Sequence, residues 1–258
     1  MKPVLVIPTR YASTRLPAKA LRLLQNKPLV QHVYERAISV EGFSDIIIAT
    51  DDSRISEVCA GFGVEACMTS GDHESGSDRL AEVVQIYDWP DDTVVVNLQG
   101  DEPLTPTANL VQLAQNLANS EDAAMATLAT PLHDEAEFLD PNIVKVVRDI
   151  NGMALYFSRS PIPLQRDANK AEAFAVSEFA LRHIGMYAYR AAFLRAFSRL
   201  QPCPLESLEK LEQLRAMYYG FRIHVDIANE IPGPGVDTEE DLQLVERLLS
   251  CAAPAVSR

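Results

Sequence analysis

The chain alternates short, largely apolar segments with longer amphipathic ones, and this alternation limits its possible folds more than any other feature. The apolar runs lie at residues 3–8 (PVLVIP), 45–50 (DIIIAT) and 93–98 (TVVVNL). A run that is apolar at every position, rather than at every second one, is typical of a strand buried on both faces of a sheet. Such strands require covering layers on both sides, so the pattern favours an α/β fold, a mostly parallel sheet with helices on both faces.

The segments between these runs complete the pattern in the first half of the chain. Another strand is predicted at 64–68, and helices are predicted at 28–39, 52–62, 78–87 and 106–118. Apolar strands that alternate with helices at this spacing indicate βαβ units. Ligands of such sheets bind beyond the carboxyl ends of the strands. The segments to inspect are therefore the loops at 9–19, 50–54, 69–78 and 99–103.

The second half has a more mixed pattern. Strands are predicted at 125–130, 143–148, 154–158, 184–190 and 222–228, helices at 205–219 and 238–249, and a polar, proline-bearing loop at 161–170. The 205–219 helix carries leucines at every third position, which we interpret as core or subunit packing, with Glu212 and Gln213 beside this stripe and able to face a cavity. No linker-like change in composition appears, so we predict one domain over 1–258 with an extension near 130–185 that contributes to the substrate site and to dimer contacts.

Charge is distributed unevenly along the 258 residues. The net charge is −13, yet residues 1–34 contain six Lys or Arg and no acid, so the remainder carries −19. An acidic protein disfavours nonspecific binding to nucleic acid or to an anionic membrane, while a short basic segment within it suggests a local anion site. There is no signal-peptide pattern, and no apolar run approaches the roughly 20 residues of a membrane span. Four cysteines without CxxC spacing indicate reduced thiols, and we predict a cytoplasmic protein.

The loop that follows the first predicted strand is the centre of this basic segment. It reads TRYASTRLPAK (9–19) and places Arg10, Arg15 and Lys19 beside the hydroxyls of Ser13 and Thr14. Arg donates bidentate hydrogen bonds to phosphate oxygens, and Lys acts as a compact charge. We therefore interpret the loop as a site for a multiply charged phosphate chain, the alternative being a solvated basic loop. It matches neither the Walker A nor the GxGxxG pattern, which argues against P-loop NTPases and dinucleotide oxidoreductases.

Two carboxylates are candidate magnesium ligands. Asp101 follows the apolar run at 93–98, and Asp237 follows a loop rich in Pro and Gly. Magnesium takes one or two protein carboxylates together with phosphate oxygens; for both residues the alternative is a turn or helix-capping role. His73 and His183 are candidates for binding only, because no Ser/His/Asp or Cys/His pattern supports covalent catalysis.

Nine ordered blocks of the chain resemble the 3-deoxy-D-manno-octulosonate (Kdo) cytidylyltransferases, also called CMP-Kdo synthetases. The resemblance runs from residue 4 to about 248, in the blocks IPTRYASTRLPAKAL (7–21), IIIATDD (46–52), CMTSGDHESGSDRLAEV (67–83), VNLQGDEP (96–103), NIVKVVRD (142–149), ALYFSR (154–159), LRHIGMYAYR (181–190), LESLEKLEQLR (205–215) and VDTEEDL (236–242). It implies a Rossmann-like nucleotidyltransferase fold, a homodimer, and a magnesium-dependent transfer of CMP from CTP to Kdo. The products would be CMP-Kdo, for lipopolysaccharide synthesis, and pyrophosphate.

The resemblance also implies roles for individual residues. The CTP phosphates would be held by Arg10, Ser13, Arg15 and Lys19. The nucleotide base and its neighbours would be surrounded by Ser75, Gly76, Arg79 and Gln99. Magnesium would be ligated by Asp101 and Asp237, and the sugar acid would be contacted by Arg159, His183, Glu212 and Gln213. The residues expected to support catalysis are Arg10, Arg15, Lys19 and Asp101.

The chain departs from the family pattern at Ala18 and Asn26, where the family usually has Gly. We expect a negative φ at Ala18 and a positive φ at Asn26, because Asn tolerates the left-handed region better than Ala. Two alternative functions follow from the same residues: a cytidylyltransferase for 8-amino-Kdo or sialic acid, and a non-catalytic nucleotide-binding module. The presence of Lys19 and Asp101 argues against the second.

Overall fold

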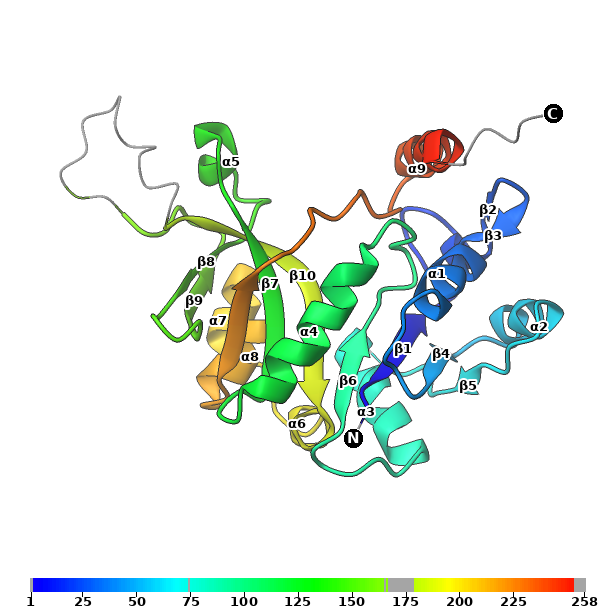
Figure 1. Cartoon of the computed structure of the whole chain (residues 1–258), viewed down its shortest axis with the longest axis horizontal. Helices are drawn as coiled ribbons and strands as arrows, with labels where there is room; N and C mark the ends of the chain where they lie inside the picture. Colours follow the sequence, from blue (N-terminus) through cyan, green and yellow to red (C-terminus); the bar gives the residue numbers. More distant parts are fainter. Residues whose placement is uncertain (1, 74, 165, 167–178, 253–258) are drawn as a thin grey trace.

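The computed structural model describes residues 2–73, 75–164, 166 and 179–252. Its centre is a sheet with the strand order β11-β7-β10-β6-β1-β4-β5, which β8 and β9 extend from β10 (Figure 1). The strands of this sheet are β1 (Val4–Thr9), β4 (Ile46–Thr50), β5 (Cys67–Met68), β6 (Val94–Asn97), β7 (Met125–Pro131), β8 (Lys145–Arg148), β9 (Ala154–Ser158), β10 (Leu181–Arg190) and β11 (Ile223–Ile227). A separate hairpin consists of β2 (Leu23–Leu24) and β3 (Lys27–Pro28).

The sheet is mostly parallel, as predicted. β1 is parallel to β4 and β6, β4 to β5, and β11 to β7. β10 is antiparallel to both β6 and β7, so it alone is reversed on the main path of the sheet. β8 and β9 add an antiparallel pair to β10. Every predicted strand is present, although the one predicted at 64–68 is reduced to two residues.

Helices cover both faces of the sheet, which confirms the α/β class. One face is covered by α1 (Leu29–Ile38), α2 (Ser53–Gly61) and α4 (Thr107–Asn119), and the other by α3 (Gly76–Ile86), α6 (Ala191–Phe197) and α8 (Gln213–Tyr218). In β1, Leu5 and Ile7 belong to the hydrophobic core on the side of α1, α2 and α4. Val4 and Val6 belong to the core on the side of α3, α6 and α8. Since successive side chains of a strand point to opposite faces, a strand between two helical layers is apolar at every position.

The prediction of one continuous helix over 205–219 is wrong, because the helix is interrupted in its middle. The chain forms α7 (Pro204–Glu209) and then α8, and Lys210 between them has a φ of 54°. This left-handed residue ends α7 and turns the chain, so the leucines do not form one stripe. Leu208 is 80% exposed, whereas Leu211 and Leu214 are buried. Five short elements of the described chain were not predicted: η1 (Lys19–Leu21), the hairpin strands β2 and β3, α5 (Glu135–Leu139) and α6.

The last helix, α9 (Glu239–Ala252), lies against the N-terminal hairpin and α1 (Figure 1). Arg22 donates two hydrogen bonds to the Glu239 carboxylate, at 2.8 and 2.7 Å. A small apolar cluster joins the same segments and consists of Leu16, Leu24, Leu29, Val236, Leu242 and Val245. These contacts fix a late segment of the chain beside the basic loop. Within the described part of the chain, no helix is long and apolar enough to cross a membrane.

Candidate active site

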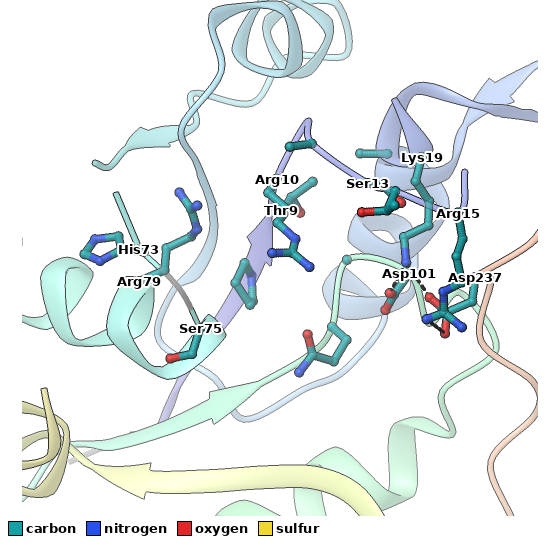
Figure 2. A pocket seen from close by; sticks show the side chains of 17 residues that line it. Thr9, Arg10, Ser13, Arg15, Lys19, His73, Ser75, Arg79, Asp101 and Asp237 are labelled. Carbon is teal, nitrogen blue, oxygen red and sulfur yellow. Dashed lines mark hydrogen bonds and ion pairs between the residues drawn. The ribbon is translucent and has the colours of Figure 1, made fainter. Parts of the chain in front are cut away.

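The basic loop leaves β1 at the carboxyl end of the parallel strands, where the fold class predicts ligand binding. Two attachments fix it. Leu16 is buried in the apolar cluster shared with α9, and the Arg54 guanidinium lies over the Tyr11 ring, 3.4 Å from the ring centre. Next to or between these attachments, the side chains of Arg10, Ser13 and Arg15 line the cavity shown in Figure 2.

Ala18 corrects one expectation about this loop. Its φ of 52° and ψ of 36° lie in the left-handed region, so the predicted negative φ is wrong, while the positive φ of Asn26 (66°) is confirmed. For an L-residue with a Cβ this region costs about 1–2 kcal/mol. The conformation ends the extended loop and starts the turn of η1, where the Leu21 amide donates to the Ala18 carbonyl at 2.8 Å. The turn places Lys19 at the cavity wall (Figure 2).

Two carboxylates converge on Lys19. Its ammonium donates hydrogen bonds to Asp101 Oδ2 at 2.5 Å and to Asp237 Oδ1 at 2.9 Å, and Arg15 Nη2 lies 2.9 Å from the other Asp237 oxygen (Figure 2). Burial of Lys19 opposes its charge, but the two carboxylates outweigh that effect and raise the pKa of Lys19 above its usual value. The acids and the cations of this site therefore neutralise one another.

Asp101 and Asp237 fit the predicted magnesium site by their chemistry. Both are carboxylates, both line the same cavity, and they already share one cation. Among the described residues no group of three or more His, Cys, Asp or Glu side chains is arranged to hold a metal ion. Magnesium suits a pair of this kind, since it commonly takes one or two protein carboxylates and completes its shell with phosphate oxygens and water.

Gly100 allows the chain to bring Asp101 to this position. A Cβ at Gly100 would lie 2.4 Å from Thr9 Oγ1 and 3.0 Å from the Pro8 carbonyl oxygen. The segment after β6 thus passes directly against the end of β1, which only a residue without a side chain permits. This close approach sets Gln99 and Asp101 beside the start of the basic loop.

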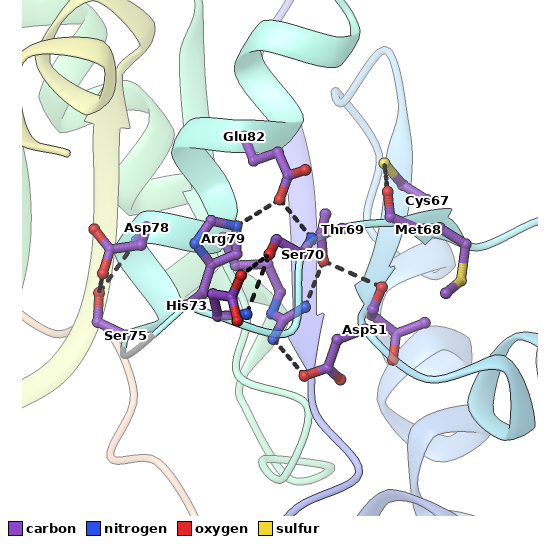
Figure 3. Close-up of polar contacts among 12 residues, drawn as sticks. Asp51, Cys67, Met68, Thr69, Ser70, His73, Ser75, Asp78, Arg79 and Glu82 are labelled. Atoms are coloured by element: carbon purple, nitrogen blue, oxygen red, sulfur yellow. Dashed lines mark hydrogen bonds and ion pairs between the residues drawn. The ribbon is translucent and has the colours of Figure 1, made fainter.

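The opposite wall of the cavity is the start of α3. Ser75 caps the helix by accepting a hydrogen bond from the Asp78 amide at 3.1 Å, and Gly76 is its first residue. Arg79 is only 3% exposed and donates to Thr69 Oγ1 and to Asp51 Oδ2, the latter at 3.0 Å (Figure 3). Its guanidinium is thus already paired and ties α3 to the loops after β4 and β5.

His73 reaches the same cavity from the loop before α3. His73 Nε2 and Glu82 Oε2 are 2.5 Å apart, and Glu82 Oε2 also accepts a hydrogen bond from the Ser70 amide at 2.8 Å (Figure 3). The pair and the amide hold residues 70–73 against α3. From the sequence, His73 is a candidate for ligand binding only. In the structure it is part of the cavity wall.

The basic loop, the two carboxylates, His73 and the start of α3 line one cavity of about 300 Å³. It includes every residue that the sequence predicted for phosphate, base and magnesium: Arg10, Ser13, Arg15, Lys19, Ser75, Gly76, Arg79, Gln99, Asp101 and Asp237. A cavity with three loop cations, two carboxylates and a helix N-terminus can bind a polyphosphate and a divalent cation together.

A second, smaller pocket of about 130 Å³ has a different character. Its lining is largely aromatic and contains Tyr187, Tyr189, Phe193, Phe197 and Met125, with Ser77, Ala216, Glu212 and Gln213. The tyrosines of β10 and the phenylalanines of α6 form a continuous row of ring contacts, with centroids 5.2 to 5.9 Å apart. Sequence reasoning missed the tyrosines, although their period-2 spacing puts both on one face of a strand.

Glu212 and Gln213 are the polar groups of this pocket. Glu212 Oε1 and Gln213 Nε2 are buried and have no hydrogen-bond partner among the described residues. Burial raises the pKa of Glu212 above its usual value, although hydrogen bonds from Ser75 and Ser77 oppose that shift. Buried polar atoms without partners are costly, so these two atoms mark places where a polar ligand would complete the hydrogen bonding.

The other two residues implied for the sugar acid lie outside both linings. His183 contacts the pocket through the Tyr187 ring, whose centroid is 5.4 Å from the imidazole centroid. Arg159 donates from Nε to the Glu209 carbonyl at 2.6 Å and from Nη1 to the Pro141 carbonyl at 2.9 Å. Those bonds tie the end of β9 to α7 and to the segment after α5, and Arg159 does not line the pocket that contains Glu212.

Known proteins match this chain over nearly its whole length. The cytidylyltransferase family model matches residues 4–227. The 3-deoxy-manno-octulosonate cytidylyltransferase of Thioalkalivibrio sulfidiphilus is 54% identical over 94% of this chain and 97% of its own length. The enzyme of the same name from Vibrio vulnificus is 53% identical, over 95% of this chain and 97% of its own.

Solved structures agree with these relatives. A structure of CMP:2-keto-3-deoxy-manno-octonic acid synthetase complexed with CTP has a TM-score of 0.87 and 42% identity, covering 98% of this chain and 100% of its own. A 4-diphosphocytidyl-2C-methyl-D-erythritol synthase, at 14% identity, has a TM-score of 0.62 over 96% of this chain and 98% of its own, and shares the fold. The chain belongs to the cytidylyltransferase family and, within it, to the 3-deoxy-manno-octulosonate cytidylyltransferases.

Proposed function

We propose that this chain transfers CMP from CTP to the anomeric hydroxyl of Kdo, giving CMP-Kdo and pyrophosphate. The observation that carries the proposal is the 300 Å³ cavity, where the cations of the basic loop face Asp101 and Asp237 at the carboxyl end of the sheet. Family membership supports the same reaction, because its members are named for Kdo and a solved relative binds CTP.

In this reaction the anomeric oxygen of Kdo forms a bond to the α-phosphorus of CTP, and the bond from that phosphorus to the bridging oxygen of pyrophosphate breaks. Arg10, Arg15 and Lys19 would bind the phosphate oxygens and balance the charge that develops on the leaving group. Transfers of this kind depend mainly on positioning and charge stabilisation. The exposed side chains of Arg10 and Arg15 suit that role, because a ligand reaches them without rearranging the core.

Asp101 and Asp237 would hold magnesium, which when bound would neutralise phosphate charge and lower the pKa of the attacking hydroxyl. Triphosphate oxygens would replace the carboxylates as partners of Lys19 and Arg15. We infer that the chain supplies no dedicated side-chain base. A limb of the pH–rate profile that disappears in His183→Ala while both substrates still bind would contradict this inference.

Glu212 and Gln213 would bind hydroxyls of the sugar acid in the aromatic pocket. Their unpartnered buried atoms supply one acceptor and one donor there, and the neighbouring rings exclude water. His183 and Arg159 are proposed to contact the same substrate from outside that lining.

The experiment that tests the function follows pyrophosphate release with CTP, magnesium and, in parallel, Kdo, 8-amino-Kdo and sialic acid. We expect release with Kdo. Release with sialic acid alone would contradict the substrate assignment, and release with 8-amino-Kdo alone would favour that alternative. No release with any sugar, from a folded protein that binds CTP, would favour the non-catalytic alternative.

We further propose that the protein acts in the cytoplasm as a homodimer and supplies CMP-Kdo for lipopolysaccharide synthesis. Exposed apolar side chains beside β8 and β9, such as Ile150 and Leu155, support a subunit contact there. Light scattering on the purified protein tests this, and the mass of one 28.5 kDa chain would contradict the dimer.

A further inference from the structure

A bulge in β10 brings Thr127 of β7 beside His183. The two strands pair antiparallel, but their register shifts between Ile184 and Tyr187. The Thr127 hydroxyl, which is fully buried, fills this irregularity: it lies 2.7 Å from the Met186 carbonyl oxygen and 3.0 Å from the Ile184 carbonyl oxygen. His183 Nε2 is also 3.0 Å away. Bulges near active sites often redirect a side chain, and here the register shift follows one residue after His183, which itself still pairs with Ala129.

The chemistry of these three neighbours determines where the protons lie. A hydroxyl has one hydrogen to donate and two lone pairs to accept with, whereas a carbonyl oxygen only accepts. The Thr127 hydrogen is therefore directed to a carbonyl, most directly that of Met186 at 2.7 Å. Its lone pair is then left for His183 Nε2, which must carry a hydrogen to make that contact. The opposite arrangement would leave both buried carbonyls without this donor, at an energetic cost.

The surroundings keep the imidazole neutral and fix its plane. Burial lowers the pKa of His183 to about 3, so one ring nitrogen carries a proton at neutral pH and the other does not. Phe157 packs edge-on with its ring centroid 5.0 Å away, and Tyr187 packs at 5.4 Å. The side-chain hydrogen bond of His183 to the described residues is made by Nε2 and leaves Nδ1 to a ligand.

We propose that Thr127 is a positioning residue that fixes the tautomer of His183, keeping the proton on Nε2 and leaving Nδ1 as an acceptor for a hydroxyl of the sugar substrate. The tautomer assignment stands on the contacts alone. The ligand contact rests on the proposed function, in which His183 meets the sugar acid. The fixed acceptor would distinguish a hydroxyl at that place from a group that cannot donate.

Long-range proton–nitrogen spectra of histidine-labelled protein test the tautomer directly. We expect the His183 ring, identified by its loss in His183→Gln, to show a protonated Nε2 and an unprotonated Nδ1. In Thr127→Val, which keeps the shape and removes the hydroxyl, the ring should sample both tautomers, and Thr127→Ser should restore the wild-type pattern. A protonated Nδ1 in the wild-type protein would overturn the proposal even if Thr127→Val fails to fold.

Steady-state kinetics test the ligand contact. Thr127→Val should raise the KM for Kdo about tenfold, the effect of one lost hydrogen bond, and leave the KM for CTP unchanged. Thr130→Val, a matched change on the same strand, should alter neither constant. An unchanged KM for Kdo in Thr127→Val would overturn the contact. A wild-type protein that does not use Kdo would contradict the proposed function, while the spectra would still decide the tautomer.

Discussion

The 300 Å³ cavity and the aromatic pocket are built in opposite ways. The cavity takes its charges from loops, and its cations and carboxylates neutralise one another in direct ion pairs, with the side chains of Arg15 and Asp237 67% and 48% exposed. The pocket takes most of its walls from β10, α6 and α8, and two of its polar atoms, Glu212 Oε1 and Gln213 Nε2, are buried without partners among the described residues. The first region satisfies its charges before a ligand arrives, and the second leaves hydrogen bonds for the ligand to complete.

This difference determines how each region would distinguish one ligand from another. A cavity of exposed, exchangeable charges binds any suitably charged phosphate chain and gains specificity from its walls. A pocket of fixed rings with unpaired polar atoms rejects a ligand that lacks the matching groups, because the buried atoms then stay unsatisfied. Changes in the cavity should therefore affect the chemical step, and changes in the pocket should affect recognition of one substrate.

Asp101→Asn should have the largest effect. It removes a charge that would hold magnesium and that pairs with Lys19, so kcat should fall about 10²–10³-fold, the loss typical of one transition-state-stabilising group. Pyrophosphate release measures it. Asp122→Asn is the control, because the Asp122 side chain is 76% exposed and does not line the cavity. Near-normal turnover by Asp101→Asn would show that this carboxylate is not a metal ligand.

Glu212→Gln should show that the pocket and the cavity bind different substrates. A hydrogen bond to a charged group contributes about 1.5–3 kcal/mol, so the KM for Kdo should rise roughly 10- to 100-fold while the KM for CTP stays the same. Initial rates with each substrate varied in turn measure both constants. Glu121→Gln, an exposed change, is the control. A parallel rise in the KM for CTP would mean that the pocket and the cavity act as one site.

The pH dependence of stability should reveal the dry environment of His183. Between the ordinary pKa of 6.5 and the folded value of about 3, the unfolded chain binds a proton that the folded chain does not. The effect of His183 on the free energy of unfolding is therefore most favourable above pH 6.5. As the pH falls from 6.5 towards 3, the free energy of unfolding decreases by at most about 1.4 kcal/mol per pH unit. Urea unfolding at pH 7 and 5 measures it, and His183→Gln should flatten the dependence. Equal slopes in the two proteins would contradict the burial of this imidazole.

Ala18→Gly should have the smallest effect. It relieves a left-handed alanine, worth about 1–2 kcal/mol, but adds backbone entropy to the unfolded chain, worth about 0.5–1 kcal/mol. The net gain should lie between zero and about 1.5 kcal/mol, at roughly 2–4 °C in Tm per kcal/mol, with kcat unchanged. Ala12→Gly, on the same loop, gains nothing in this way and serves as the control. A lower Tm for Ala18→Gly than for Ala12→Gly would contradict the strain.

The parts that sequence predicted well are those in which neighbouring residues carry the information. The apolar run at 93–98 requires helices on both sides, and the cations of the basic loop lie within ten residues of one another. Parallel strands end at the same edge of a sheet, so Asp101 and the loop were expected to meet. The structure brings them together.

The parts that sequence could not predict depend on distant contacts. Ala18 adopts its φ because Leu16 is anchored under α9 while Lys19 is drawn to two carboxylates. Lys210 breaks a segment whose leucine spacing reads as one helix. Arg79 carries a charge that would suit a ligand, yet Asp51 and Thr69 pair with it inside the wall. In each case local propensity is overridden by packing or charge elsewhere in the fold.

The attachment of α9 to the N-terminal hairpin has a consequence for biosynthesis. The cations of the loop are made within the first 20 residues, whereas Asp237 and the helix that fixes it are made more than 200 residues later. Domains begin to fold while the chain is still being synthesised, so the loop leaves the ribosome without one of its two acidic partners. The cavity is completed only when α9 docks, so its acidic wall depends on a segment that is made more than 200 residues after its basic wall.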